Sequence, residues 1–108
     1  MRDTGKDAGD AIIQEYVDYI NELRAEKLKN PPLVGFRRLK KYARIVILGK
    51  GTRPTEAFGF IDLASGDILK AASWSRPAKH ARGNVFDRET WPASCNERGI
   101  TYLPTWRD

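Results

Sequence analysis

The sequence has almost no cysteine or histidine, which removes the ligand sets of the commonest structural metal sites. Cys95 is the only cysteine and His80 the only histidine among 108 residues. An intramolecular disulfide is therefore impossible, and a zinc site built from several Cys or His ligands is excluded. We interpret Cys95 as an ordinary small residue in a reducing compartment, and we expect no metal and no cofactor.

Long apolar runs are also missing. No segment approaches the roughly 20 apolar residues that a membrane-spanning helix needs. Residues 1–7 are too polar to begin a signal peptide. We therefore expect a cytoplasmic protein with no membrane partner. A length of 108 residues, of which 41% are hydrophobic, fits one domain with one core.

Acidic side chains are absent from two stretches of the chain. Residues 37–53 hold seven Lys and Arg and no acid, and residues 70–82 hold four Lys and Arg, one His and no acid. The net charge of +5 combines −2 in residues 1–30 with +7 in the rest of the chain. A partner attracted by charge should therefore dock on the second part of the chain.

What is present begins with an amphipathic helix. Apolar residues recur at helical spacing from Ile12 to Leu23, with acidic residues between them, which predicts a helix over residues 10–29. Asp10 suits the N-cap, and the two prolines that follow Asn30 end the helix. Residues 1–9 show no such pattern and are predicted to form a flexible arm, ahead of a single α+β domain over residues 10–108.

Three strands are predicted after the helix, over residues 43–48, 57–63 and 68–74. A turn at residues 49–54 and a hairpin turn at residues 64–67 would join them into an antiparallel meander. The helix is the natural cover for one face of this sheet. The predicted fold is thus α+β, with an N-terminal helix on a three- to four-stranded antiparallel sheet.

The remaining segments have weaker patterns. Residues 33–41 are predicted to be a basic connector, residues 75–84 a surface loop and residues 87–98 a short helix. Residues 100–103 could add an edge strand. An exposed edge can pair with a second copy, so a homodimer stays open.

The two basic stretches form the candidate site. Cations neutralise phosphates and aromatic rings stack on bases, which is the combination that single-stranded nucleic acid requires. We predict that the two stretches form one continuous cationic surface that binds DNA or RNA. The candidate contact residues are Arg37, Arg38, Lys41, Arg44, Lys70, Trp74, Arg76, Lys79, His80 and Arg82.

Two other interpretations of this surface stay open. The same surface could dock on an acidic protein, or it could only keep the protein in solution. Catalysis would need more than a single histidine, and turn or capping roles explain the carboxylates at positions 62, 67, 87 and 89. We therefore predict no enzyme activity and no catalytic residues.

One stretch resembles a known group of proteins. Lys-Ala-Ala-Ser-Trp at residues 70–74, followed by Pro-Ala-Lys-His-Ala-Arg-Gly-Asn at residues 77–84, is similar to a motif of small uncharacterised bacteriophage proteins. The resemblance covers roughly residues 42–87 and brings no known activity. It implies a phage protein in the cytoplasm of a bacterial host, where inhibition of a host protein or defence complex is the alternative to nucleic-acid binding.

Overall fold

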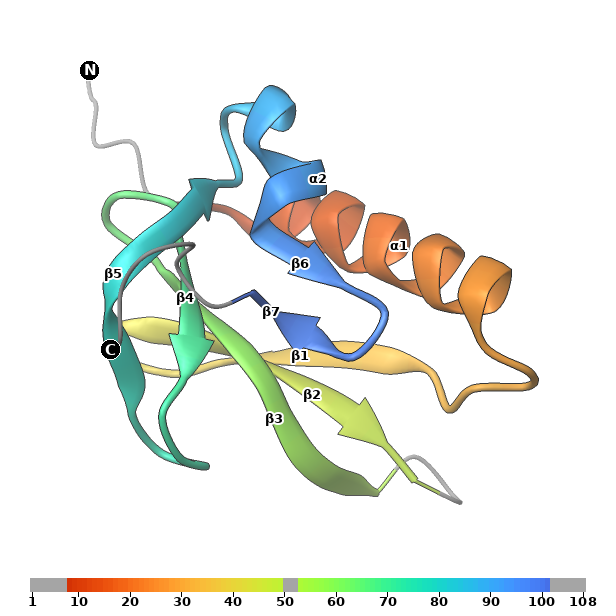
Figure 1. Cartoon of the computed structure of the whole chain (residues 1–108). Coiled ribbons are helices and arrows are strands. Elements are labelled where there is room, and N and C mark those ends of the chain that lie inside the picture. The colour runs from red at the N-terminus through yellow and green to blue at the C-terminus, as the bar shows by residue number, and fades with distance from the viewer. Residues whose placement is uncertain (1–7, 50–52, 102–108) are drawn as a thin grey trace.

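The fold, given by a computed structural model, combines one long helix with an antiparallel sheet (Figure 1). The structure describes residues 8–49 and 53–101. Helix α1 (Asp10–Lys27) precedes five strands paired in chain order, and a C-terminal segment follows with a small hairpin of its own. The five strands are β1 (Val34–Arg38), β2 (Tyr42–Leu48), β3 (Pro54–Asp62), β4 (Asp67–Ala71) and β5 (Pro77–Asn84). The C-terminal elements are η2 (Arg88–Thr90), α2 (Trp91–Ser94), β6 (Cys95–Asn96) and β7 (Gly99–Ile100).

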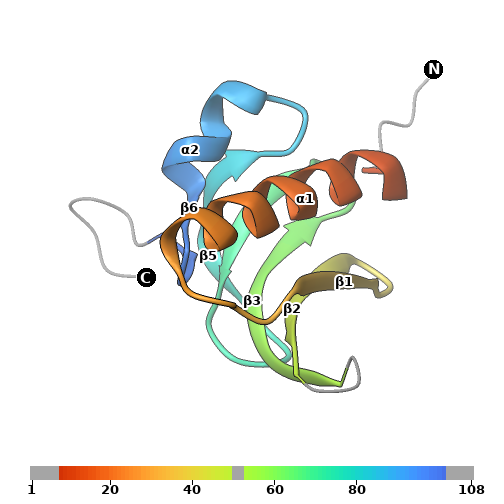
Figure 2. The same cartoon turned by 90° about the vertical axis from the view of Figure 1, so that its right-hand side faces the viewer.

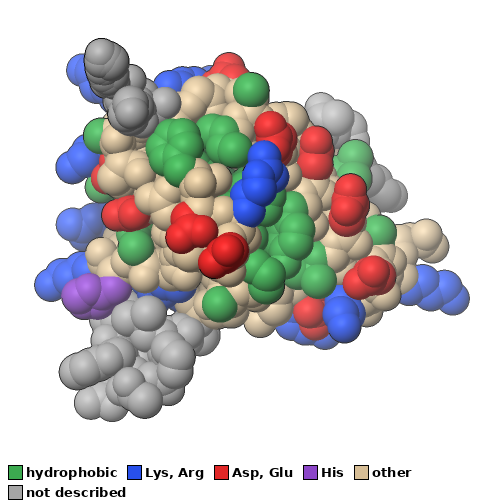
Figure 3. Space-filling model, turned by 90° about the horizontal axis from the view of Figure 1, so that it is seen from above, with side chains coloured by type: hydrophobic (Ala, Val, Ile, Leu, Met, Phe, Trp, Pro, Cys, Tyr) green, Lys and Arg blue, Asp and Glu red, His purple; other side chains and the backbone are tan. Residues whose placement is uncertain are grey.

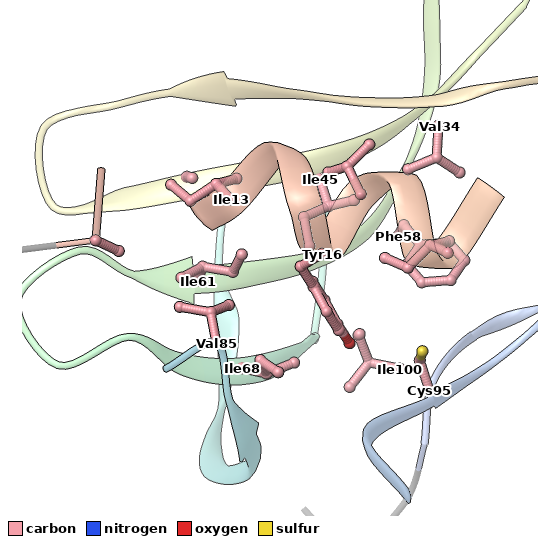
Figure 4. Packing of buried hydrophobic residues seen from close by; sticks show 14 of the residues in the cluster. Ile13, Tyr16, Val34, Ile45, Phe58, Ile61, Ile68, Val85, Cys95 and Ile100 are labelled. Atoms are coloured by element: carbon pink, nitrogen blue, oxygen red, sulfur yellow. The ribbon is translucent and has the colours of Figure 1, made fainter. Parts of the chain in front are cut away.

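Helix α1 crosses one face of the sheet and closes the core against it (Figure 2). Ile13 and Tyr16 of α1 are fully buried over Ile45, Ile61 and Ile68 of the strands (Figure 4). The predicted helix, and its place over the sheet, are confirmed. Its boundaries differ slightly: position 9 is the N-cap, the residue expected there is the first of the helix, and the helix ends two residues earlier than expected.

The predicted connector over residues 33–41 is wrong, because most of it is strand β1. Every residue of β1 pairs with β2, from Val34 opposite Ile47 to Arg38 opposite Ala43. Val34 is buried, and the side-chain amide of Asn21 bonds both its N–H and its carbonyl oxygen, at 2.8 and 3.0 Å. Because the segment is rich in Lys and Arg, its sequence does not show that its side chains point alternately to the two faces of the sheet.

The predicted surface loop over residues 75–84 is wrong for a related reason. It contains β5, the last strand of the sheet, which pairs with β4 through two irregularities in register. Only positions 78 and 82 of β5 are buried. A strand at the edge of a sheet needs little apolar alternation, so its sequence resembles a loop. Strand β4 correspondingly ends at Ala71, and Trp74 lies in the turn that follows rather than in a strand.

The ends of the chain also differ from expectation. The predicted helix over residues 87–98 reduces to η2 and α2, after which β6 begins. Strand β7 pairs with β6 and not with the main sheet, and residues 102 and 103 lie outside the described residues. The predicted arm is described only from Ala8, which is buried and donates its N–H to Leu63 O at 2.7 Å. Residues 50–52 of the predicted turn also lie outside the described residues.

A buried hydrogen-bond chain fastens α2 to α1. The Ser94 hydroxyl donates to Trp91 O at 2.7 Å, so its oxygen accepts the Tyr16 hydroxyl proton across another 2.7 Å. The rings of Tyr16 and Trp91 meet edge to face at 5.2 Å. Burial raises the pKa of the Tyr16 hydroxyl far above its usual range, and it also raises the pKa of the Cys95 thiol.

We expect this burial to make the fold sensitive to alkaline pH. The folded chain keeps the Tyr16 and Cys95 protons, whereas the unfolded chain loses them above the ordinary values of 10.0 and 9.0. The free energy of unfolding should therefore decrease as pH rises through that range, by up to about 1.4 kcal/mol per pH unit for each group. Urea unfolding between about pH 8 and about pH 11 measures the slope.

Tyr16→Phe should flatten this decrease, because the substituted ring has no proton to lose. The same substitution at the half-buried Tyr42 is the matched control, because Tyr42 takes no part in the buried chain of Tyr16, Ser94 and Trp91. Equal slopes in all three proteins would contradict the assignment.

Candidate nucleic-acid interface

The two faces of the sheet carry different side chains. Ala43, Ile45 and Ile61 point toward α1, so the residues between them point to the opposite side. We call this side, turned away from α1, the outer face. Across it the register aligns Arg37 with Arg44, Arg44 with Phe60 and Phe60 with Leu69. One row of the outer face therefore begins with two cations and continues with two apolar side chains.

The turn between β4 and β5 folds back to this row. Arg44 Nε donates to Trp74 O at 2.8 Å, and the Arg44 guanidinium carbon lies 4.3 Å from the centre of the Trp74 ring. The same guanidinium lies 5.8 Å from the centre of the Phe60 ring. Phe60 is fully buried, whereas Trp74 is 46% exposed. The Arg44 side chain thus lies between two aromatic rings, the buried ring of Phe60 and the solvent-exposed ring of Trp74.

Tyr42 continues the aromatic row. Its ring meets Phe60 edge to face at 5.9 Å. Lys41 Nζ lies 5.5 Å from the centre of the Tyr42 ring. Tyr42 is half-buried and Lys41 is exposed. Aromatic rings and cations therefore lie beside one another on the outer face, an arrangement that can pair stacking with phosphate contact.

The structure brings the two predicted basic segments into contact at Arg44 and Trp74. Arg37 and Lys41 belong to the same surface through their places beside Arg44 and Tyr42. Arg76 lies in the same turn as Trp74, and its carbonyl accepts the N–H groups of residues 72 and 73 at 2.9 and 3.1 Å. Lys79 and His80 follow on β5, where both are exposed. Six of these seven candidates are exposed, and the seventh, Arg44, is held by its bond to Trp74 O.

The other three candidates are engaged within the fold. Arg38 donates to Ala8 O at 2.7 Å and forms an ion pair with Asp10 at 3.1 Å. Lys70 Nζ donates to the carbonyl oxygen of residue 100 at 2.9 Å. Arg82 Nε donates to the carbonyl oxygen of residue 101 at 3.0 Å, and burial lowers the pKa of Arg82. These contacts give Arg38, Lys70 and Arg82 roles within the fold.

The Arg82-Gly83-Asn84 motif supports the fold. The side-chain amide of Asn84 donates to Ser65 O at 2.9 Å and to Asp67 Oδ1 at 3.0 Å. Its main-chain carbonyl accepts the Trp91 indole N–H at 3.3 Å. Asn84 therefore ties the end of β5 both to the turn before β4 and to the start of α2. Gly83, the residue before it, packs closely against Thr90 of η2 and Ser94 of α2.

Charge is divided between the two sides of the molecule. Residues 34–84, which contain the sheet, hold eleven Lys and Arg against three Asp and Glu, for a net charge of +8. Helix α1 holds five acidic residues against two basic ones. Seen from the side of α1 and α2, acidic side chains are spread among apolar ones, and most Lys and Arg lie at the rim (Figure 3). An anionic partner is therefore attracted to the sheet and repelled by the helix.

Residues 8–49 and 53–101 contain neither a cluster of metal ligands nor a membrane-spanning helix. No three His, Cys, Asp or Glu side chains there lie close enough together to hold one metal ion. No helix in the same ranges has the length and apolar content to cross a membrane.

Comparison with known proteins identifies one family. Residues 10–102 match the model of a family of unknown function, DUF7717. The match covers all the helices and strands described above. No curated protein and no solved structure matches the chain.

We expect Gly83→Ala to destabilise the fold. An added Cβ would lie 2.8 Å from Thr90 Oγ1 and 3.1 Å from Ser94 Cβ. Both side chains are held by hydrogen bonds, so the free energy of unfolding should decrease by about 1–3 kcal/mol. Gly99→Ala is the matched control, because no atom of the described residues, its chain neighbours aside, lies within 4 Å of its Cβ position. Equal urea midpoints for the two variants would count against this account of the motif.

Proposed function

This chain belongs to the family of unknown function DUF7717, and we propose that it is a non-enzymatic protein that binds single-stranded nucleic acid on the outer face of its sheet. The observation that supports this most directly is the exposed Trp74 ring resting on Arg44. A base that stacks on Trp74 would have the cations of β1, β2 and the turn within reach of its phosphates.

The Trp74 ring is held in place before any partner arrives. The Arg44 side chain bonds the Trp74 carbonyl and lies against its ring, and two further hydrogen bonds close the turn at Arg76. A ring fixed in this way loses little conformational freedom when a base stacks on it. Stacking of one base on an aromatic side chain is worth about 1–3 kcal/mol.

A single strand fits this surface better than a duplex. In a duplex the bases are already stacked on one another, so no base is free to stack on an exposed aromatic side chain of the protein. A docking site for an acidic protein or a duplex backbone would use the cations and leave Trp74 without a role. The setting that we propose is the cytoplasm of an infected bacterium, on the strength of the resemblance to bacteriophage proteins.

Fluorescence anisotropy with labelled single-stranded and duplex oligonucleotides tests the proposal. We expect tighter binding of the single strand, and we expect Trp74→Ala to weaken that binding about tenfold through the loss of one stacking contact. Phe86→Ala is the matched control, because Phe86 is 51% exposed and lies beside the turn before β4, away from Arg44.

The salt dependence separates phosphate contact from stacking. Arg37→Gln should lower the slope of log affinity against log salt by about 0.7, the value for one phosphate contact on a single strand. Trp74→Ala should leave the slope unchanged. No binding by the unaltered protein at low salt, or equal losses in the Trp74 and Phe86 variants, would reject the proposed function.

A further inference from the structure

A hollow opens at the start of β5, next to the turn that contains Trp74. Its volume is about 570 Å³, and it is lined by Ala72, Arg76, Pro77, Ala78 and Lys79. Two of these residues are cationic and none is acidic. The other three have short side chains, which leaves room for a group the size of a sugar and phosphate.

The side chains of the two cations in this hollow do not stabilise the described fold through polar contacts. Among residues 8–49 and 53–101, no hydrogen bond or ion pair involves the side chain of Arg76 or Lys79. A second hollow, of about 380 Å³, also contains two cations, Lys70 and Arg98. There, however, Lys70 Nζ already donates to Ile100 O at 2.9 Å. In the hollow at the start of β5, by contrast, neither lining cationic side chain makes a hydrogen bond or an ion pair with the described residues.

We propose that this hollow holds one phosphodiester group of the strand, next to the base that stacks on Trp74. The inference rests on the proposed function and specifies what the site recognises. The recognised unit is a single dinucleotide step, a base with its neighbouring phosphate. The hollow takes the negatively charged phosphate between Arg76 and Lys79, and the adjoining base lies on the Trp74 ring.

The turn keeps ring and hollow at a fixed separation. The Cα atoms of Trp74 and Arg76 are two residues apart and so lie within about 7 Å of each other. The N–H groups of Ala72 and Ser73 bond Arg76 O at 2.9 and 3.1 Å, which closes the backbone between them. A base and its neighbouring phosphate are joined through one sugar, so a rigid pair of sites at this spacing selects that unit.

The experiment compares two dinucleotides that differ only in charge. One carries the natural phosphodiester, and the other carries a neutral methylphosphonate in its place. Binding of each is measured by the change in tryptophan fluorescence. We expect the neutral dinucleotide to bind the unaltered protein about fivefold more weakly. In the double variant Arg76→Gln/Lys79→Gln the two dinucleotides should bind equally, because the groups that distinguish them are gone.

The double variant Lys40→Gln/Arg53→Gln is the matched control. It also removes two positive charges, but from exposed positions outside the hollow. It should therefore retain the fivefold difference. Equal binding of the two dinucleotides to the unaltered protein would overturn this inference. So would undetectable dinucleotide binding while longer single strands still bind. Failure of the longer strands themselves to bind would instead reject the proposed function.

Discussion

Hydrogen bonds from buried and half-buried cations to the backbone of residues 97–101 hold the C-terminal segment in place. Arg24 donates to Glu97 O at 2.7 Å, Lys70 to Ile100 O at 2.9 Å and Arg82 to Thr101 O at 3.0 Å. Strands β6 and β7 contain two residues each, so they satisfy few backbone groups by themselves. Carbonyl groups left without partners in this setting would be costly. These bonds hold Ile100 where it completes the core.

Hydrogen bonds within the fold divide the basic residues into two groups. Cations on the α1 side of the sheet are engaged within the fold, Lys70 by the C-terminal segment and Arg38 by Ala8 and Asp10. Cations on the outer face, such as Arg37, or in the turn after β4, such as Arg76, meet no carbonyl of that segment. Because side chains alternate along a strand, neighbours in the sequence can have unrelated roles. The outer face therefore keeps exposed cations such as Arg37, while Lys70 is used within the fold.

The turn after β4 joins the fold to its candidate site. Asn84 and Gly83 fix the end of β5 against α2, and Arg44 fixes the other end of the β4–β5 hairpin against β2. Trp74 is therefore held by Arg44 and still exposes nearly half of its surface. An exposed ring on a firm support is suited to stacking, since the order it needs is already present in the free protein.

The sequence by itself determined α1, strands β2, β3 and β4 in outline, and the concentration of positive charge after the helix. These features are local, because apolar periodicity and composition report burial along one segment. Only the tertiary structure decided that residues 77–84 form a strand, since an edge strand carries no clear apolar pattern. It also decided which cations are engaged: the partners of Arg24 and Arg82 lie 73 and 19 residues away. The contact of Arg44 with Trp74, 30 residues apart, likewise depends on the fold and not on any local pattern.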